Sequence, residues 1–231
     1  MKGIENMSRI KTFSASVAII AGSALSAQAA LVDFTDSASY TISGSTGSGS
    51  VSGIAYQISA TGGNLNNSEA GPSEAGRTGP LAGTVDGLGV GDDEITFGNQ
   101  SVTVTFASAV NVVSLYFLDL FGTNPGGAAE ATDEMVNVSV DGGEGVVFSA
   151  QTLNQDGTVG LGAFTGLMLS GTSFTFTAME PNDAFGSPDF ALAGIEFSDI
   201  APIPLPAGGL LLAGALGGLG FAARRRRRAD V

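Results

Sequence analysis

Apolar and polar residues alternate along much of the chain between residues 30 and 200. In the clearest segments, a Val, Ile, Tyr or Phe occupies every second position and a smaller or polar residue lies between; these segments are 54–58, 102–106, 136–140 and 174–176. A strand with one buried and one solvated face has this period of two. Gly, Asn, Asp and Ser interrupt the segments, as they do in turns. The pattern predicts a body built of short strands.

Two further segments, 110–120 and 190–197, are apolar nearly throughout. The first is typical of a central strand that is covered on both sides, and the second of a closing strand. No segment of the body has a helical period. The expected fold is therefore all-β, an antiparallel β-sandwich or jelly roll of about nine to eleven strands. Its Val, Leu, Ile and Phe residues suffice for a core without disulfides.

Two long polar and Gly-rich segments, 61–93 and 119–134, lack this alternation of apolar and polar residues. Loops of such length are usually functional or mobile. The division that we expect is a signal peptide over 1–29, an acidic β-sandwich domain over 30–200, and a Pro-rich linker with a C-terminal sorting signal over 201–231.

The N-terminal segment has the pattern of a secretory signal. Lys2, Arg9 and Lys11 precede an apolar stretch over 13–25, and Ala27-Gln28-Ala29 fits the small-residue cleavage pattern. The alternative is an uncleaved membrane helix, for which the stretch is short.

The C-terminal segment has three parts. A proline-containing motif comes first, consisting of Ile203, Pro204, Leu205, Pro206 and Ala207. An apolar run over 207–223 follows, and as a helix it would be about 25 Å long, enough for a thin bilayer. The basic cluster then consists of Arg224, Arg225, Arg226, Arg227 and Arg228. By the positive-inside rule this cluster stays in the cytoplasm, so we expect a single transmembrane helix with the body on the outer side.

This order of motif, apolar helix and arginine cluster resembles the PEP-CTERM sorting signals, in particular the VPLPA-CTERM variant, with Ile203 in place of Val. The resemblance covers residues 203–228. It implies an exosortase-type membrane protease as a partner, processing near Pro206 or Ala207, anchoring in the inner membrane during sorting, and then a place at the cell surface or outside the cell. Residues 91–119 also loosely resemble the bodies of proteins with this signal, which are commonly jelly-roll-like.

Two other interpretations of the C-terminal segment stay open. It can be a plain membrane anchor. It also faintly resembles a sortase signal over Leu205–Gly208, although Gly208 stands where that family has Thr and no spacer precedes the apolar run.

Charge is segregated along the chain. Residues 30–200 contain 20 acidic residues and one basic residue, Arg77, for a formal charge of −19, whereas the whole chain has −13. Such a body would repel phosphate groups, so we expect no nucleic-acid partner. Cysteine and histidine are both absent. This excludes disulfides, thiolate chemistry and histidine-based triads.

The candidate metal ligands are Asp92, Asp93, Glu94 and Asp119, which lie at predicted loop and strand ends. Calcium prefers oxygen ligands of this kind, so a structural Ca²⁺ held by Asp92 or Glu94 with Asp119 is a hypothesis. The alternative is that these are solvated turn residues of an acidic protein.

No catalytic motif is present, so the chain is not expected to be an enzyme. Sugar-binding faces usually carry exposed aromatic rings, but the chain has no Trp and Tyr116 lies in a predicted buried strand. The leading expectation is an exported structural or adhesive protein of the cell envelope or extracellular matrix, with exopolysaccharide as a candidate partner. A carbohydrate- or calcium-binding surface module is the alternative.

Overall fold

The computed structural model describes residues 29–67, 80–122, 133–153, 160–179 and 188–199, together with Gly214. In chain order its strands are β1 Ala30–Asp33, β2 Tyr40–Ser43, β3 Thr46–Val51, β4 Ile54–Thr61, β5 Leu65–Asn66, β6 Gly89–Val90, β7 Ser101–Leu118, β8 Phe121–Gly122, β9 Met135–Val140, β10 Gly145–Ser149, β11 Thr152–Leu153, β12 Gly162–Met179 and β13 Ala191–Asp199. Within 29–199 the described residues contain no helix. The expectation of an all-β body with antiparallel strands is confirmed.

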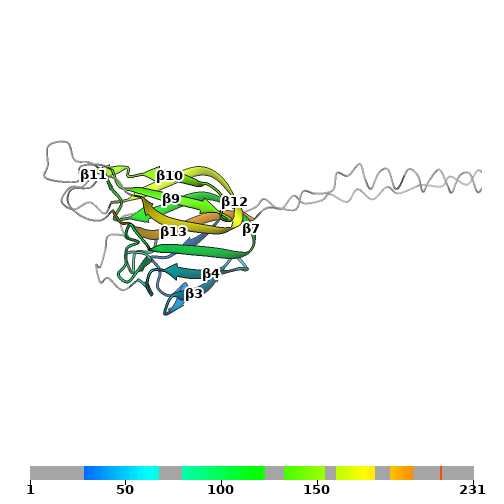
Figure 1. Ribbon diagram of the computed structural model, residues 1–231. Helices are drawn as coiled ribbons and strands as arrows, with labels where there is room; N and C mark the ends of the chain where they lie inside the picture. Colours follow the sequence, from blue (N-terminus) through cyan, green and yellow to red (C-terminus); the bar gives the residue numbers. More distant parts are fainter. Residues whose placement is uncertain are drawn as a thin grey trace, which may run out of the picture.

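Nine of these strands form one sheet in which every neighbouring pair is antiparallel (Figure 1). Its order is β10-β9-β12-β7-β4-β3-β2, and β13 also pairs with β7 and carries β1 on its other side. Two small ladders, the parallel β8–β11 and the antiparallel β5–β6, stand apart from it. The described strands outnumber the expected nine to eleven because the two ladders add four strands of two residues each.

Two 18-residue strands, β7 and β12, lie side by side at the centre of the sheet. The sequence pattern predicted two strands over 102–106 and 110–120, but the structure joins them in β7. The first half of β7 pairs with β4, with Tyr56 opposite Phe106. The second half pairs on the same edge with β13, with Leu118 opposite Ala191. One strand therefore has a different neighbour along each half, and the sheet divides there.

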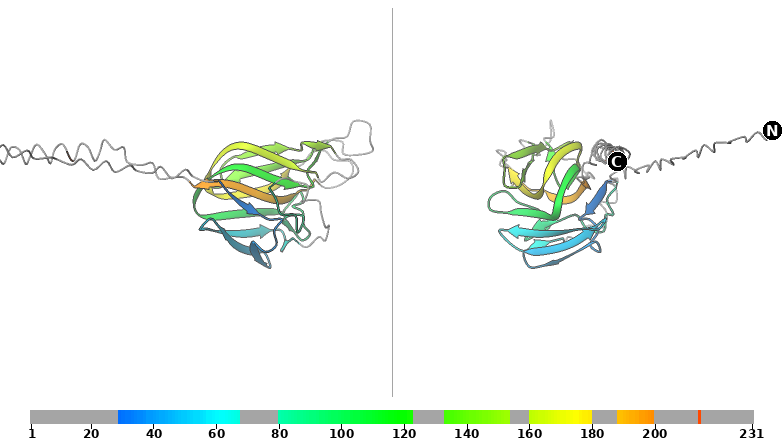
Figure 2. Two further views of the ribbon diagram at one scale, coloured as in Figure 1. Left: turned by 180° about the vertical axis from the view of Figure 1, so that it is seen from behind. Right: turned by 90° about the vertical axis from the view of Figure 1, so that its right-hand side faces the viewer.

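The sheet folds over so that its two parts face each other (Figure 2). The ring of Phe106, in the first half of β7, lies 4.8 Å from that of Phe197 in β13. The ring of Phe117, in the second half of β7, lies 6.2 Å from that of Phe176 near the end of β12. These contacts define two layers, one with β2, β3, β4, β9 and β10, the other with β1 and β13, with β7 and β12 running through both.

The main core fills the space between the layers. Val102, Val104 and Phe106 are buried, while Thr105 on the opposite face is exposed, as the alternation predicted. The second half of β7 is buried on both faces, because Leu115 joins the main core whereas Leu118 joins a second cluster with Leu81 and Ala191. The expectation of a central strand covered on both sides is confirmed.

Among the described residues, no helix has the length and apolar character needed to span a membrane. The expected signal peptide up to residue 28, the sorting motif 203–207 and the arginine cluster 224–228 lie outside the described residues, as does the apolar run 207–223 except for Gly214.

Candidate functional site

Residues 88–97, which include β6 and the loop after it, are held against the start of β13 and the segment that leads into it. The backbones of Leu88 and Leu192 exchange two hydrogen bonds of 3.0 Å. Further along, the Ile95 N–H donates to the Phe190 carbonyl at 2.7 Å. The Phe97 N–H donates to the Pro188 carbonyl at 2.8 Å. The acidic residues of this loop are thereby placed beside residues far away in the sequence.

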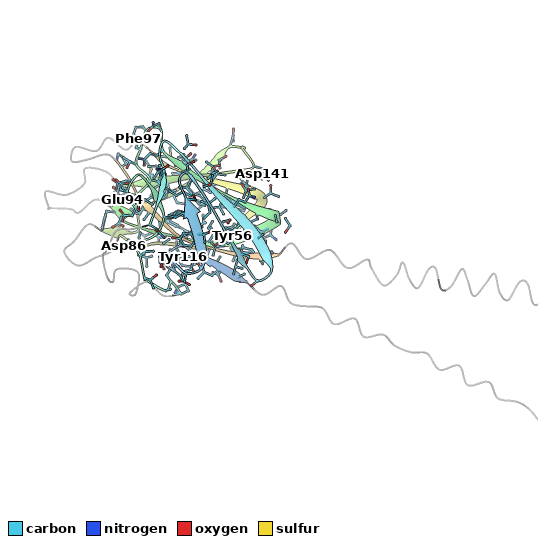
Figure 3. The ribbon with its side chains drawn as sticks, turned by 90° about the horizontal axis from the view of Figure 1, so that it is seen from below. Tyr56, Asp86, Glu94, Phe97, Tyr116 and Asp141 are labelled. Atoms are coloured by element: carbon cyan, nitrogen blue, oxygen red, sulfur yellow. The ribbon has the colours of Figure 1, made fainter. Side chains whose placement is uncertain are left out.

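This arrangement brings five acidic side chains together at one end of the body, which is the end marked by Glu94 and Asp86 in Figure 3. The carboxyl group of Glu94 is influenced by the charges of Asp189, Asp119, Asp93 and Asp92. We call these five residues the acidic cluster. All four candidates from the sequence belong to it, and Asp189 is a fifth member that the sequence gave no reason to include.

The members of the acidic cluster differ in exposure. Asp92 is exposed and Asp93 is buried, with 6% of its surface accessible. Asp119 is half-buried, immediately after β7, with a positive φ of 53° that Asp tolerates better than most residues. Glu94 is partly buried, and the charges of the other four members act on it. A charged Glu94 would thus lose hydration and meet like charges.

The pKa of Glu94 is accordingly raised from its ordinary value of 4.5 to about 9. Burial is the largest cause, because it penalises the charged form, and the neighbouring carboxylates add to it, led by Asp189 and Asp119. Glu94 therefore retains its proton at neutral pH. The neighbouring carboxylates thus add to burial in favouring the protonated form of Glu94.

Replacing Glu94 with glutamine is expected to stabilise the protein at alkaline pH. The folded protein holds the Glu94 proton up to about pH 9, whereas the unfolded chain releases it near pH 4.5, so stability falls as the pH rises between these values. Glu94 is partly exposed and screening reduces the effect, so we expect a gain of about 1 kcal/mol at pH 8, or roughly 2–4 °C in Tm. Thermal melts from pH 5 to pH 9 measure it.

The matched control is Glu144→Gln, which removes the same formal charge from an exposed turn between β9 and β10. Only Glu94→Gln should flatten the dependence of Tm on pH, because Glu94 is the carboxyl group that keeps its proton up to about pH 9 in the folded protein. If Tm depended on pH equally steeply in the wild type and in Glu94→Gln, the raised pKa of Glu94 among the neighbouring carboxylates would be contradicted.

The acidic cluster is not arranged as a metal site in the part of the chain that the structure describes, where no three acidic side chains converge to hold an ion. A calcium ion would favour the charged carboxylates, so its binding would have to displace the proton of Glu94. The hypothesis of a structural Ca²⁺ at Asp92, Asp93, Glu94 and Asp119 stays a prediction from the sequence.

Other carboxylates of the body form hydrogen bonds within the fold. Glu196 of β13 accepts hydrogen bonds from the hydroxyl groups of Ser114 and Tyr116, at 2.7 and 3.3 Å. Buried Glu134 accepts one from the backbone N–H of Phe121 at 2.6 Å. These contacts tie β13 to β7 and the start of β9 to β8.

Two more carboxylates stabilise turns. Asp33 accepts hydrogen bonds from the Thr35 hydroxyl at 2.6 Å and from the Ala82 N–H at 2.7 Å. Asp141 accepts three hydrogen bonds, from the Thr172 N–H and hydroxyl and from the Ser173 N–H, at 2.8–3.0 Å. These bonds, led by the one from the Thr172 hydroxyl, lower the pKa of Asp141. Acidic residues thus have architectural roles at several separate places.

Comparison of the chain with protein-family models, with curated proteins and with solved structures gave no match. The function is therefore argued from the residues of this chain alone.

Proposed function

We propose that this chain is an exported, non-catalytic surface protein, whose acidic β body has a structural or adhesive role in a bacterial cell envelope or extracellular matrix. An exosortase-type membrane protease would process it at the C-terminal motif, so that it is held in the inner membrane during sorting and then reaches the cell surface or the medium.

The observation that carries this proposal is the order of the segments after the body. A proline-containing motif over 203–207 precedes an apolar run over 207–223 and then five arginines over 224–228. The basic residues would stay in the cytoplasm while the acidic body lies outside. An apolar run that ends in five charged residues is poorly suited to a protein core, because charged side chains are almost never fully buried without partners.

The use of carboxylates in the body supports a structural role. Glu196, Glu134, Asp33 and Asp141 each accept hydrogen bonds that join separate strands or turns. The chain also lacks histidine and cysteine, which removes the usual general base and the thiolate nucleophile.

We assign the body to the β-sandwich class, with a jelly-roll type of architecture. The support is the 4.8 Å contact between the rings of Phe106 and Phe197, which join the two layers across the core. The long strands β7 and β12 take part in both layers, as strands that pass between sheets do at the corners of such folds.

Intact-mass measurement of the mature protein from its native host tests the proposal. We expect a mass that lacks residues 1–29 and the residues beyond about Ala207. Replacing Pro204 and Pro206 together with alanine should leave the C-terminal segment attached, because the extended backbone that a protease grips would be lost.

The control is Pro202→Ala, which changes a proline of the same linker outside the motif and should leave processing intact. A wild-type mass that retains the apolar run and the arginines would make the segment a plain anchor and overturn the proposed sorting.

A further inference from the structure

An uncharged, hydroxyl-rich surface covers the outward face of β2, β3 and β4. The ribbons of β3 and β4 lie in the lower part of Figure 1. On this face the outward positions of the three strands are Thr, Ser, Gln or Ala, and the first half of β7 adds Thr103 and Thr105. None of these strand segments contains a charged residue. In a body with 20 acidic residues, this is a marked local exclusion of charge.

The register of the sheet aligns the hydroxyl groups in rows across the strands. Thr41 lies opposite Ser48, Ser48 opposite Gln57, and Gln57 opposite Thr105. The row continues into β12, where the hydroxyl group of Ser173 lies 3.4 Å from that of Thr105. Neighbouring strands are about 4.8 Å apart, so each row offers a hydrogen-bonding group at every strand.

An open groove of about 490 Å³ runs over this surface, and we call it the hydroxyl groove. Six of its lining residues carry a hydroxyl group, namely Thr41, Ser43, Thr46, Ser48, Ser59 and Thr105. Gln57 contributes an amide. A second groove of about 260 Å³ adjoins it, because Gln57 and Thr105 line both. The volume lies in the range of ordinary ligand sites.

We propose that the hydroxyl groove binds an uncharged polysaccharide chain. This deepens the adhesive role proposed above and rests on it. The lining groups donate and accept hydrogen bonds in equal measure, as the hydroxyl groups of a neutral glycan do. The rows of groups and the open, unenclosed form of the groove suit an extended polymer better than a small enclosed molecule.

Charge argues against other ligands. The groove offers no ion to pair with a charged ligand, and the body's formal charge of −19 repels polyanions. The apolar side chains that line the groove are those of Ile42, which is half-buried, and Ile58, which is only 2% exposed, so the groups that a ligand meets are mainly hydroxyls and one amide.

The two grooves have no exposed aromatic ring in their lining, and this sets the expected strength of binding. Tyr56 and Phe106 line the adjoining groove but are only 2% and 3% exposed, so they offer little stacking surface. Binding then depends on the sum of many individually weak hydrogen bonds, so it is weak for a single sugar and stronger along a polymer.

Affinity electrophoresis of the mature protein from its host tests this inference. The gels contain dextran, a soluble β-1,3-glucan, a soluble β-1,4-glucan or a galactomannan, with alginate as the anionic comparison. We expect at least one neutral polymer to retard the protein and alginate not to. The double variant Thr46→Val with Thr105→Val keeps the side-chain shape but removes two hydroxyl groups, and it should weaken binding by about tenfold.

The matched control is Thr165→Val, the same substitution at an exposed position of β12 that does not line the groove. It should bind as the wild type does. The inference is overturned if no neutral polymer retards the protein, if only alginate does, or if the double variant binds like the control. Self-association in size-exclusion chromatography that the double variant abolishes would also overturn it, in favour of a second copy of the chain.

These outcomes are separate from those of the proposed sorting. Retardation by a neutral glycan together with an unprocessed mass would support glycan binding by the groove and overturn processing by an exosortase-type protease. A processed mass without retardation would do the reverse.

Discussion

Replacing Phe117 with alanine is expected to lower the free energy of unfolding by about 3–5 kcal/mol. Phe117 is fully buried where the second half of β7 meets the other layer. Its ring lies 5.4–6.4 Å from four other rings, those of Phe148, Phe164, Phe176 and Phe190. The substitution leaves a cavity that parts of β10, β12 and the segment before β13 all border, so no single element can relax to fill it.

Urea unfolding followed by tyrosine fluorescence measures this loss, since the chain has no tryptophan. Phe97→Ala is the control, because Phe97 is 41% exposed and its removal should cost less than about 1 kcal/mol. Similar losses for the two variants would mean that Phe117 does not join the two layers.

Gly89→Ala is the second substitution with a large expected effect, a loss of about 2–3 kcal/mol. Gly89 lies in β6, where a Cβ atom would overlap the backbone of Asp93 and Glu94. The main chain must move to relieve this overlap, since no flexible side-chain end is involved. The loop that carries the acidic cluster would shift, and the Val90 N–H would lose the hydrogen bond that it donates to the Glu94 carbonyl at 2.8 Å.

Gly53→Ala separates crowding from backbone conformation. Gly53 has a positive φ of 82°, but nothing lies within 4 Å of the added Cβ, so we expect a loss of only about 1 kcal/mol from strain. The same melts from pH 5 to pH 9 give a second readout, since Gly89→Ala should also change the pH dependence that Glu94 causes. If Gly89→Ala were as stable as Gly53→Ala, the close approach of the Asp93 and Glu94 backbone to Gly89 would be refuted.

Much of the strand content followed from the sequence alone. The segments 54–58, 102–106, 136–140 and 174–176 all lie within strands, and their alternate apolar residues face the core. Period-two patterns are reliable here because one face of each strand is buried and the other is wet. β3 was not foreseen, because Thr46–Val51 contains two glycines and reads as a turn. Gly49 is needed there because a Cβ atom would overlap the hydroxyl end of buried Tyr56.

The acidic cluster was found only in part. Asp92, Asp93, Glu94 and Asp119 stood out as acidic residues at predicted strand ends, and the structure brings them together. Asp189 contributes more to the pKa of Glu94 than any of them, yet it lies far along the chain. Only the hydrogen bonds of Ile95 and Phe97 to the residues around it reveal the proximity.

The hydroxyl groove could not be predicted from the sequence of any single segment. Ser and Thr at alternate positions predict a wet strand face and nothing more. The register of β2, β3, β4 and β7 turns these positions into rows, and that register depends on which strands become neighbours.

By itself, the sequence determined the β character of the body, the buried face of its clearest strands, and the separation of acidic and basic residues along the chain. These features depend on local periodicity and composition, which need no knowledge of distant contacts. The tertiary structure alone decided that β7 is one strand shared by two layers, that Glu94 lies among four other carboxylates and retains its proton, and that an uncharged groove forms across β2, β3 and β4. Each of these depends on pairing between segments far apart in the chain, which periodicity along one strand does not encode.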